Sequence, residues 1–322
     1  MQKSTVPNKS HPHPLPPGVY TPVLSLYKAT PTQEIDHEAM YKHAQHLVLG
    51  GMHGLVYQGT NGETALLSRE EKIAVLKDIR NAVADLGVPD YPIVAGLTKD
   101  AAEAGASFGL LLPSSFWPKA VTEDVLRGFY RDVADEAPYP SCAIMCFPGA
   151  TSGVDLNSDD LAALATHPNI IGTKLTCGNV GKAIRLTSQF TAAQFAVFGG
   201  SSDFLYPTLA AGGVGCVTGM GNVWPKSTAR VYDLYVAGEL EEAKRLQEIV
   251  ASAEWACKKS LALTKSGRGI LWGRRSGLRT SGRGEKMQAW TVEVMGVLEA
   301  EEAKIPDRAF KGKGANGING SK

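Results

Sequence analysis

Short apolar runs alternate with amphipathic stretches along most of the chain. Most of the apolar runs are continuous rather than alternating, which is typical of parallel strands buried on both faces. They predict strands at residues 19–24, 54–58, 91–95, 108–112, 142–145, 170–174, 195–198 and 215–218. The amphipathic stretches predict helices at residues 36–49, 68–84, 121–136, 156–166, 180–190, 203–211 and 226–236, with Ser68 and Thr122 as the N-caps of two of them.

Strands that alternate with helices predict an α/β fold. Eight such strands favour a (β/α)8 barrel, the TIM barrel, over an open doubly wound sheet. No GxGxxG, GxxxxGKS or GxxxxGKT motif follows a predicted strand, which argues against a nucleotide-binding sheet. Beyond Gly238 the pattern is helical, at residues 239–259 and 285–304. The predicted organisation is a disordered arm (1–17), the barrel (18–237), a C-terminal helical extension packed on it (238–305) and a disordered tail (306–322).

Composition narrows the possible environments and partners. The 322 residues are 43% hydrophobic and 20% charged, the balance of a globular protein with a sizeable core. A net charge of +1 gives no global reason to expect a nucleic-acid or membrane partner. The five cysteines lack metal-ligand spacing, no apolar run reaches the ~18 residues of a membrane span, and the N-terminus lacks an apolar signal core. We therefore expect a cytoplasmic protein with reduced thiols.

A lysine ends the sixth predicted strand. The stretch IIGTKLTCGN, residues 170–179, carries a β-branched apolar run that leads to Lys174. In (β/α)8 barrels the active site lies at the C-terminal ends of the strands, so this amine is expected at the barrel mouth. Burial disfavours the charged form and lowers the pKa of a lysine, and the neutral amine can then form a Schiff base with a carbonyl carbon. The alternative for a lone lysine is a side chain that reaches from the strand end to water.

A glycine-rich turn follows the second predicted strand, in GLVYQGTNGETALLS, residues 54–68. Two glycines flank Thr60 and Asn61, so the backbone can approach a ligand closely and offer N–H groups to a carboxylate. The alternative is a plain turn between strand and helix, since glycine and asparagine are common turn formers. We expect Glu63 to cap the helix that follows.

Several stretches together resemble one family. GTNGE after the second strand, GTK at the end of the sixth, the opening GVYTPVLSLY and FAVFGGSSDFLYPTLAAGGVGCVTGMGNVWP at residues 195–225 resemble the dihydrodipicolinate synthase/N-acetylneuraminate lyase superfamily of class I, pyruvate-type aldolases. The likeness covers roughly residues 18–255. GTNGE and the FPG turn at residues 147–149 are most similar to fungal aldolases of 2-keto-3-deoxy sugar acids of the L-threo-3-deoxy-hexulosonate type.

The resemblance implies a role for four residues. Lys174 matches the Schiff-base lysine, Thr60 the hydroxyl of the proton relay, Asn61 the neighbour that helps to hold the 2-keto carboxylate, and Val217 the residue whose backbone lines the pyruvate site. The implied reaction cleaves or forms a 2-keto-3-deoxy sugar acid, giving pyruvate and an aldehyde, with no metal or organic cofactor. A homo-oligomer, dimer or tetramer, is also implied.

The chain departs from the family pattern where protons are transferred. The family places a general acid/base tyrosine on the fifth strand, and IMCFPG puts Met145 there and Cys146 at the following asparagine. A second relay tyrosine, lent by a neighbouring subunit, falls closest to Phe116. Three hydroxyl residues remain open as substitutes: Tyr57, Thr60 and Ser115. A dihydrodipicolinate synthase-like enzyme, a 4-hydroxy-2-oxoglutarate aldolase-like enzyme and a pseudo-enzyme that binds the keto acid without turnover therefore stay as alternatives.

Two further departures concern the scaffold. Residues 97–107 must hold the whole crossover between the third and fourth strands, and a parallel crossover needs about a dozen residues. Residues 264–286 are basic and rich in glycine and serine, where the family has ordered helix and loop. We interpret this basic run as a solvated loop rather than a nucleic-acid site, since it lacks interleaved aromatic residues. A divergent paralogue and a faulty gene model both remain open.

Overall fold

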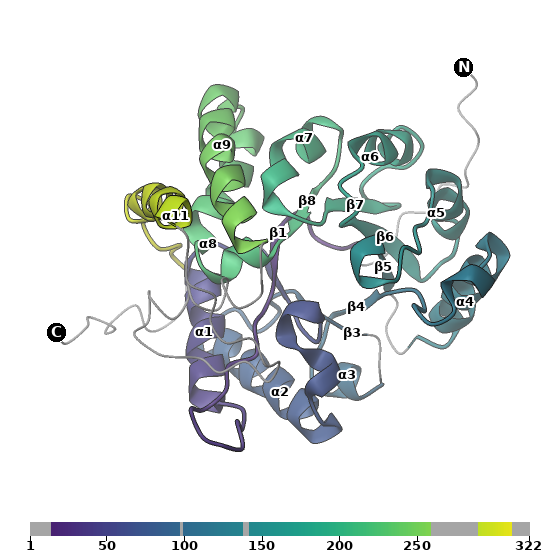
Figure 1. Cartoon of the computed structure of the whole chain (residues 1–322), viewed down its shortest axis with the longest axis horizontal. Coiled ribbons are helices and arrows are strands. Elements are labelled where there is room, and N and C mark those ends of the chain that lie inside the picture. The colour runs from purple at the N-terminus through teal and green to yellow at the C-terminus, as the bar shows by residue number, and fades with distance from the viewer. Residues whose placement is uncertain (1–13, 97–98, 138–141, 259–288, 311–322) are drawn as a thin grey trace.

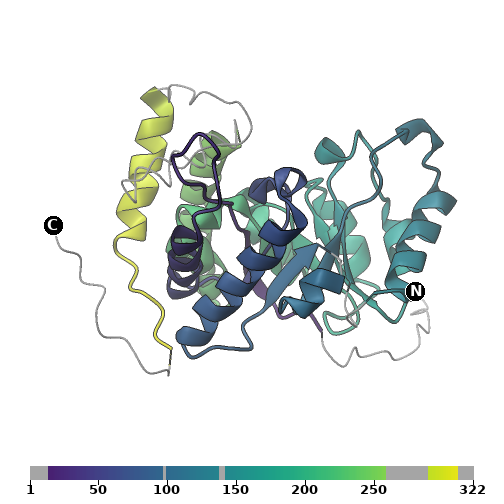
Figure 2. The same cartoon turned by 90° about the horizontal axis from the view of Figure 1, so that it is seen from below.

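A computed structural model describes residues 14–96, 99–137, 142–258 and 289–310. In these residues eight parallel strands follow one another in chain order and close into a barrel, with helices around it (Figures 1 and 2). The predicted (β/α)8 barrel is therefore confirmed. The strands are β1 (Gly18–Pro22), β2 (Gly54–Val56), β3 (Ile93–Gly96), β4 (Phe108–Leu111), β5 (Cys142–Cys146), β6 (Ile170–Leu175), β7 (Ala196–Gly199) and β8 (Gly215–Val217).

The helices agree with the amphipathic pattern. They are α1 (His37–Leu49), α2 (Arg69–Asp85), α3 (Lys99–Glu103), α4 (Glu123–Asp135), α5 (Ser158–Leu164), α6 (Val180–Thr187), α7 (Leu205–Ala210), α8 (Pro225–Val236), α9 (Leu240–Cys257) and α11 (Ala289–Glu302). Ser68 caps α2 in a capping box with Glu71, and Thr122 caps α4, as predicted. Within the described residues, no helix combines the length and the apolar character that a membrane crossing needs.

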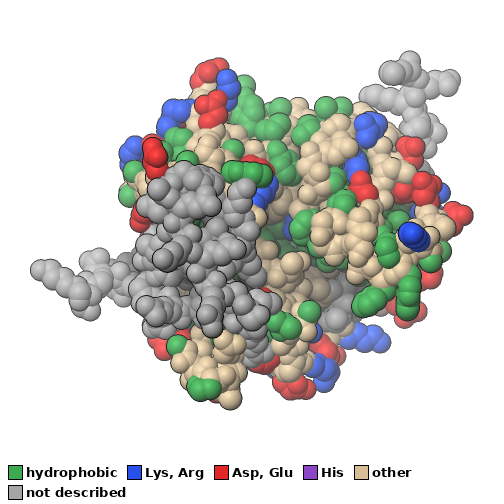
Figure 3. All heavy atoms as spheres, viewed as in Figure 1, with side chains coloured by type: hydrophobic (Ala, Val, Ile, Leu, Met, Phe, Trp, Pro, Cys, Tyr) green, Lys and Arg blue, Asp and Glu red, His purple; other side chains and the backbone are tan. Residues whose placement is uncertain are grey.

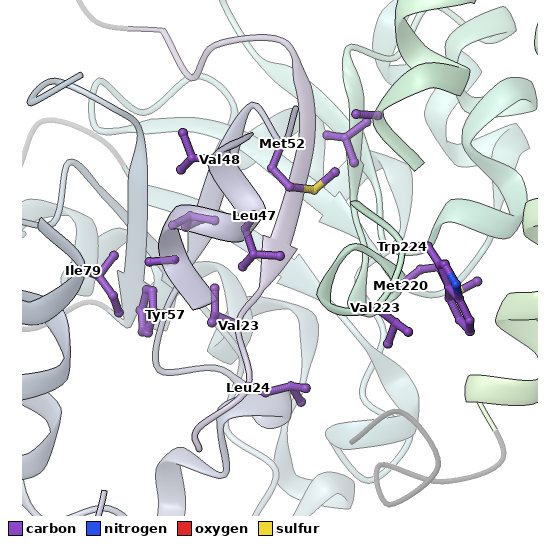
Figure 4. Close-up of a cluster of buried hydrophobic side chains, with 14 of the residues drawn as sticks. Val23, Leu24, Leu47, Val48, Met52, Tyr57, Ile79, Met220, Val223 and Trp224 are labelled. Atoms are coloured by element: carbon purple, nitrogen blue, oxygen red, sulfur yellow. The ribbon is translucent and has the colours of Figure 1, made fainter. Parts of the chain in front are cut away.

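The core lies in two layers, one inside the barrel and one between barrel and helices. Tyr20, Val56, Phe198 and Val217 belong to the inner cluster, where the Tyr20 and Phe198 rings meet edge to face at 5.5 Å. A larger cluster lies between the outer surface of strands β1, β2 and β3 and the helices α1, α2, α8 and α9. Figure 4 shows part of this cluster. Inward and outward side chains alternate along each strand, which explains why the strands are apolar on both faces.

The C-terminal helices pack on one side of the barrel. α9 and α11 contact each other and α8, and Figure 2 shows α11 at the outer edge. Lys226 and Ser227, at the start of α8, donate their backbone N–H groups to the carboxylate of Glu302 on α11 at 2.8 and 2.6 Å. The predicted helical extension is present.

The predicted boundaries of arm and tail need correction. Leu15 was assigned to the arm, but it is buried in the inner cluster of the barrel. Arg308 was assigned to the tail, but its backbone N–H bonds the carbonyl oxygen of Leu49 at 2.6 Å and its guanidinium pairs with Asp233. Phe310 packs against the larger cluster. The remaining arm and tail, residues 1–13 and 311–322, and the basic run at 264–286 lie outside the described residues.

The short third crossover closes the barrel with a helix of five residues, α3. Arg80 of α2 braces this region, since its guanidinium donates hydrogen bonds to the carbonyl oxygens of Pro89, Tyr91 and Gly105 at 2.7, 2.9 and 3.0 Å. Burial lowers the pKa of this guanidinium. Backbone carbonyls without a helical partner need another donor. The arginine therefore ties the loop that precedes β3 to the residues that follow α3.

Candidate active site

A pocket of about 450 Å³ lies at the C-terminal ends of the strands. Its lining comes from the ends of most strands and the loops that follow them, and from the C-terminal end of α9. The pocket brings together all five residues singled out from the sequence: Thr60, Asn61, Met145, Lys174 and Val217. On the face in Figure 3, the described Lys and Arg side chains are interspersed with Asp and Glu.

Lys174 lies near the C-terminal end of β6 and lines the pocket. Its register neighbours are Met145 on β5 and Phe198 on β7, and its side chain is 7% exposed. Burial among these apolar groups lowers the pKa of the amine from 10.5 to about 8, against a smaller opposing effect of the Cys216 thiol. Roughly a tenth of the Lys174 side chains therefore carry the neutral, nucleophilic amine at pH 7.

The turn after β2 is held in a strained shape. Gln58 and Glu63 have left-handed φ angles of 57° and 50°, which residues other than glycine seldom adopt. Two hydrogen bonds fix the turn. The Ser25 hydroxyl donates to the carbonyl oxygen of Gly62 at 2.6 Å, and the Thr64 hydroxyl donates to the carbonyl oxygen of Gly59 at 3.0 Å. The predicted helix cap at Glu63 is wrong, since Glu63 is buried between two short 3-10 turns and Ser68 caps α2.

Within this turn, Thr60 and Asn61 lie at the pocket wall. Thr60 is exposed, and Asn61 extends towards the loop after β8, where a Cβ atom added at Gly219 would lie 2.6 Å from its Nδ2. A side chain at this position would displace the Asn61 amide. The pocket lining therefore includes a hydroxyl, an amide and the Lys174 amine, a combination that suits a carboxylate with an adjacent carbonyl.

Of the three open substitutes for the tyrosine, Tyr57 and Thr60 line the pocket. Tyr57 borders it, but its ring packs in the larger cluster with Val23 and Ile79, as Figure 4 shows. Burial, helped by the Asp78 charge, raises the pKa of its phenol well above 10, so the phenol stays protonated at neutral pH. Ser115 is not among the residues that line the pocket.

Thr176 and Glu254 are two of the pocket residues that the sequence analysis missed. Thr176 follows Lys174 by two positions, packs against Gly200, and its buried hydroxyl has no hydrogen-bond partner among the described residues. Residues two apart in a strand face the same side, so the position of Lys174 could have indicated Thr176. Glu254 of α9 accepts hydrogen bonds from the hydroxyls of Ser201 and Thr218 at 2.6 and 3.1 Å, and burial raises its pKa. No local pattern could have found Glu254, because it reaches the pocket through the docking of α9.

The comparisons with known proteins agree with this geometry. The model of the dihydrodipicolinate synthetase family matches residues 16–262. The "Probable 4-hydroxy-2-oxoglutarate aldolase, mitochondrial" of Emericella nidulans is 42% identical over 265 residues, 79% of this chain and 84% of the relative. The L-threo-3-deoxy-hexylosonate aldolase of Hypocrea jecorina is 38% identical over 271 residues, 78% of this chain and 85% of the relative. A crystal structure of a dihydrodipicolinate synthase family protein from Coccidioides immitis has a TM-score of 0.79 and 33% identity, and covers 94% of this chain and 100% of that one.

Fold and pocket define a (β/α)8 protein with a buried lysine at the mouth of the barrel, the architecture of the aldolases that the sequence resembles. The chain belongs to the dihydrodipicolinate synthetase family.

Proposed function

We propose that this protein is a class I aldolase that cleaves or forms a 2-keto-3-deoxy sugar acid through a Schiff base on Lys174. The observation that carries the proposal is the buried amine of Lys174 with a pKa of about 8. Relative to a lysine with the ordinary pKa of 10.5, this increases the neutral fraction at pH 7 roughly 300-fold. The printed names of the fungal relatives support the same reaction class.

The chemistry follows from the positions of the side chains. The neutral Lys174 amine attacks the C2 carbonyl carbon, and loss of water gives an iminium ion. When the C4 hydroxyl loses its proton, the C3–C4 bond breaks and its electron pair moves into the iminium to form an enamine. Protonation at C3 and hydrolysis then release pyruvate and restore the amine. The lysine is itself the electron sink, so the reaction requires no metal or organic cofactor.

Substrate binding falls to the turn after β2. Asn61 and the backbone N–H groups around it hold the C1 carboxylate, and Thr60 relays protons between substrate and pocket. Val217 supports the pyruvate moiety through its backbone. Met145 lies beside Lys174 and has no exchangeable proton, so Thr60 carries more of the proton transfer than a threonine paired with a tyrosine would.

A pseudo-enzyme that keeps the keto-acid pocket is the second candidate, and Met145 is the observation that favours it. Borohydride reduction in the presence of pyruvate, read by mass spectrometry beside a turnover assay, separates the two. The aldolase proposal requires both a trapped adduct and pyruvate release from a 2-keto-3-deoxy sugar acid. An adduct without turnover supports the pseudo-enzyme, and no adduct refutes both.

A hydroxyl in the pocket favours a sugar acid over 4-hydroxy-2-oxoglutarate. Thr176 lines the pocket, and its hydroxyl, which has no hydrogen-bond partner among the described residues, can bond a polyol chain. A second carboxylate would need a cation, and the Lys258 ammonium at the rim already pairs with Asp203 at 2.5 Å. We expect kcat/KM to be higher for the sugar acid. Because this ammonium is already engaged, Lys258→Met should change kcat/KM for 4-hydroxy-2-oxoglutarate little, and a large loss confined to that substrate would contradict the preference.

We further propose a homo-oligomer and keep the cytoplasm as the compartment. Phe116 and Trp117, after β4, are 74% and 80% exposed with ring centroids 6.0 Å apart, an apolar pair suited to a contact with a second copy. Light scattering should give a mass above 34.2 kDa that falls in a Phe116→Ser, Trp117→Ser variant. The Emericella nidulans relative carries "mitochondrial" in its name, so cell fractionation tests the compartment.

A further inference from the structure

A second cluster of reactive side chains lies beside the pocket, where β5 and β6 end. Its sulfur and carboxylate atoms, from Cys146, Asp155 and Cys177, all lie within 4.8 Å of one another. The Cys146 thiol donates a hydrogen bond to Oδ1 of Asp155 at 2.6 Å. Lys182 of α6 adds its Nζ at 2.8 Å from the same oxygen and 3.5 Å from Sγ of Cys146. None of these four residues lines the pocket.

The two thiols differ in charge and access. Cys177 is half-buried, and the neighbouring Cys146 thiol, the Asn179 N–H and the Lys182 ammonium lower the pKa of Cys177 to about 6. Cys146 is fully buried. The negative charge on Cys177, burial and the hydrogen bond to Asp155 raise the pKa of the Cys146 thiol. Around neutral pH the cluster therefore pairs a reachable thiolate with a buried thiol, the arrangement of an attacking and a resolving cysteine.

The cluster suits a redox reaction better than a metal ion. Two thiolates and a carboxylate could hold a divalent cation, but the Lys182 ammonium already provides positive charge there. Its Nζ also donates to the carbonyl oxygen of Leu156 at 2.5 Å, which fixes it in place. A metal ion would need to displace this buried ammonium and bring a second positive charge into the same space.

We propose that Cys177 and Cys146 form a disulfide on exposure to a hydroperoxide. The Cys177 thiolate attacks a peroxide oxygen, the O–O bond breaks, and hydroxide or alkoxide leaves with the electron pair, giving a sulfenic acid. The Cys146 thiol passes its proton to Asp155 and attacks the Cys177 sulfur, and the hydroxide that leaves takes up that proton as water. The two thiols are oxidised by two electrons and the peroxide is reduced to water, or to water and an alcohol.

The backbone already holds the two cysteines close. The N–H of Thr176 bonds the carbonyl oxygen of Cys146 at 2.9 Å, so the residue before Cys177 is anchored to Cys146 itself. A disulfide requires the sulfurs, now within 4.8 Å of each other, to approach to ~2 Å, so the Cys146 side chain must rotate away from Asp155. The bridge would join the end of β5, next to Met145, to the loop three residues after Lys174.

Oxidation should therefore alter the pocket. Phe147 and Thr176 line the pocket and adjoin Cys146 and Cys177 in sequence, so a bridge that moves either loop changes both. We expect slower borohydride trapping of pyruvate in the oxidised protein. This last expectation rests on the proposed function, whereas the disulfide does not, so failure of one leaves the other standing.

The test uses the full-length protein, reduced, desalted and treated with hydrogen peroxide. Peptide mapping should find a Cys146–Cys177 crosslink that a thiol reductant removes. With dimedone present, Cys146→Ser should accumulate the sulfenic acid adduct at Cys177, and Cys177→Ser should show none at Cys146. Cys257→Ser serves as the matched control, a cysteine change outside the cluster that should leave the crosslink intact.

A second measurement does not depend on the variants folding. The alkylation rate of wild-type Cys177 by iodoacetamide should be half-maximal near pH 6. Peroxide treatment of the wild type that yields no Cys146–Cys177 peptide, or that oxidises Cys177 only to the sulfinic acid, overturns the proposal. A Cys177 alkylation rate that rises only above pH 8 overturns the assignment of Cys177 as the attacking thiol.

Discussion

Replacing the ammonium of Lys174 by an apolar group should stabilise the ligand-free protein. The perturbation is Lys174→Met, which keeps the length and most of the volume of the side chain between Met145 and Phe198. In the wild type the buried amine has a pKa of about 8, against 10.5 in water. The folded state therefore carries a desolvation cost that the methionine variant lacks.

The size and the pH window of this cost follow from linkage. The unfolded chain binds more protons than the folded protein between pH 8 and pH 10.5, so the Lys174 contribution to stability rises with pH in that window. Below pH 8 the cost is full, ~3 kcal/mol at pH 7, because one pKa unit corresponds to ~1.4 kcal/mol. By pH 9.5 it should fall by ~2 kcal/mol.

Urea denaturation of wild type and Lys174→Met at pH 7 and pH 9.5 measures this difference. The stability advantage of the variant should shrink by ~2 kcal/mol between the two pH values. Lys77→Met, at an exposed position of α2, is the matched control for a lysine removed without burial, and its difference from wild type should stay constant. An advantage of Lys174→Met that is the same at both pH values would refute a buried amine with a depressed pKa.

Three further predictions concern catalysis and the scaffold. Met145→Tyr should raise kcat by a large part of the ~10²–10⁴ that a general acid or base contributes, with little change in keto-acid affinity. A steady-state assay checks this, and the gain should vanish when Thr60→Val is added. Thr176→Val should raise KM for the sugar acid roughly tenfold by removing a hydroxyl that bonds the substrate, while trapping of pyruvate stays unchanged. Hydrogen exchange should show lower protection in α3 than in β6, since a five-residue helix makes few internal hydrogen bonds, and equal protection would contradict this.

The sequence carried the essentials of the fold and much of the pocket because both depend on local patterns. Continuous apolar runs, the cap at Ser68 and the strand-end position of Lys174 are short-range features, and they placed the barrel and the lysine correctly. The turn residues Thr60 and Asn61 meet Lys174 because parallel strands in a closed barrel all end on the same face.

The features that the sequence did not reveal depend on which strand residues point inward, on how the strands pair and on how α9 packs against the barrel. In a continuous apolar strand the sequence does not indicate which residues point into the barrel. Tyr57 therefore remained a candidate general acid, although Val56 is the residue that faces the barrel interior. The closeness of Cys146 and Cys177 depends on the pairing of β5 with β6. Glu254 depends on the docking of α9.

The central claim is that Lys174 forms the Schiff base, and one comparison tests it most directly. Wild type and Lys174→Ala are each incubated with pyruvate, reduced with borohydride and digested, and the modified lysine is located by mass spectrometry. We predict an adduct on Lys174 in the wild type and none in the variant, with the fold of the variant verified by circular dichroism. An adduct that persists in folded Lys174→Ala, or that maps to Lys182 or Lys258 in the wild type, would contradict the account.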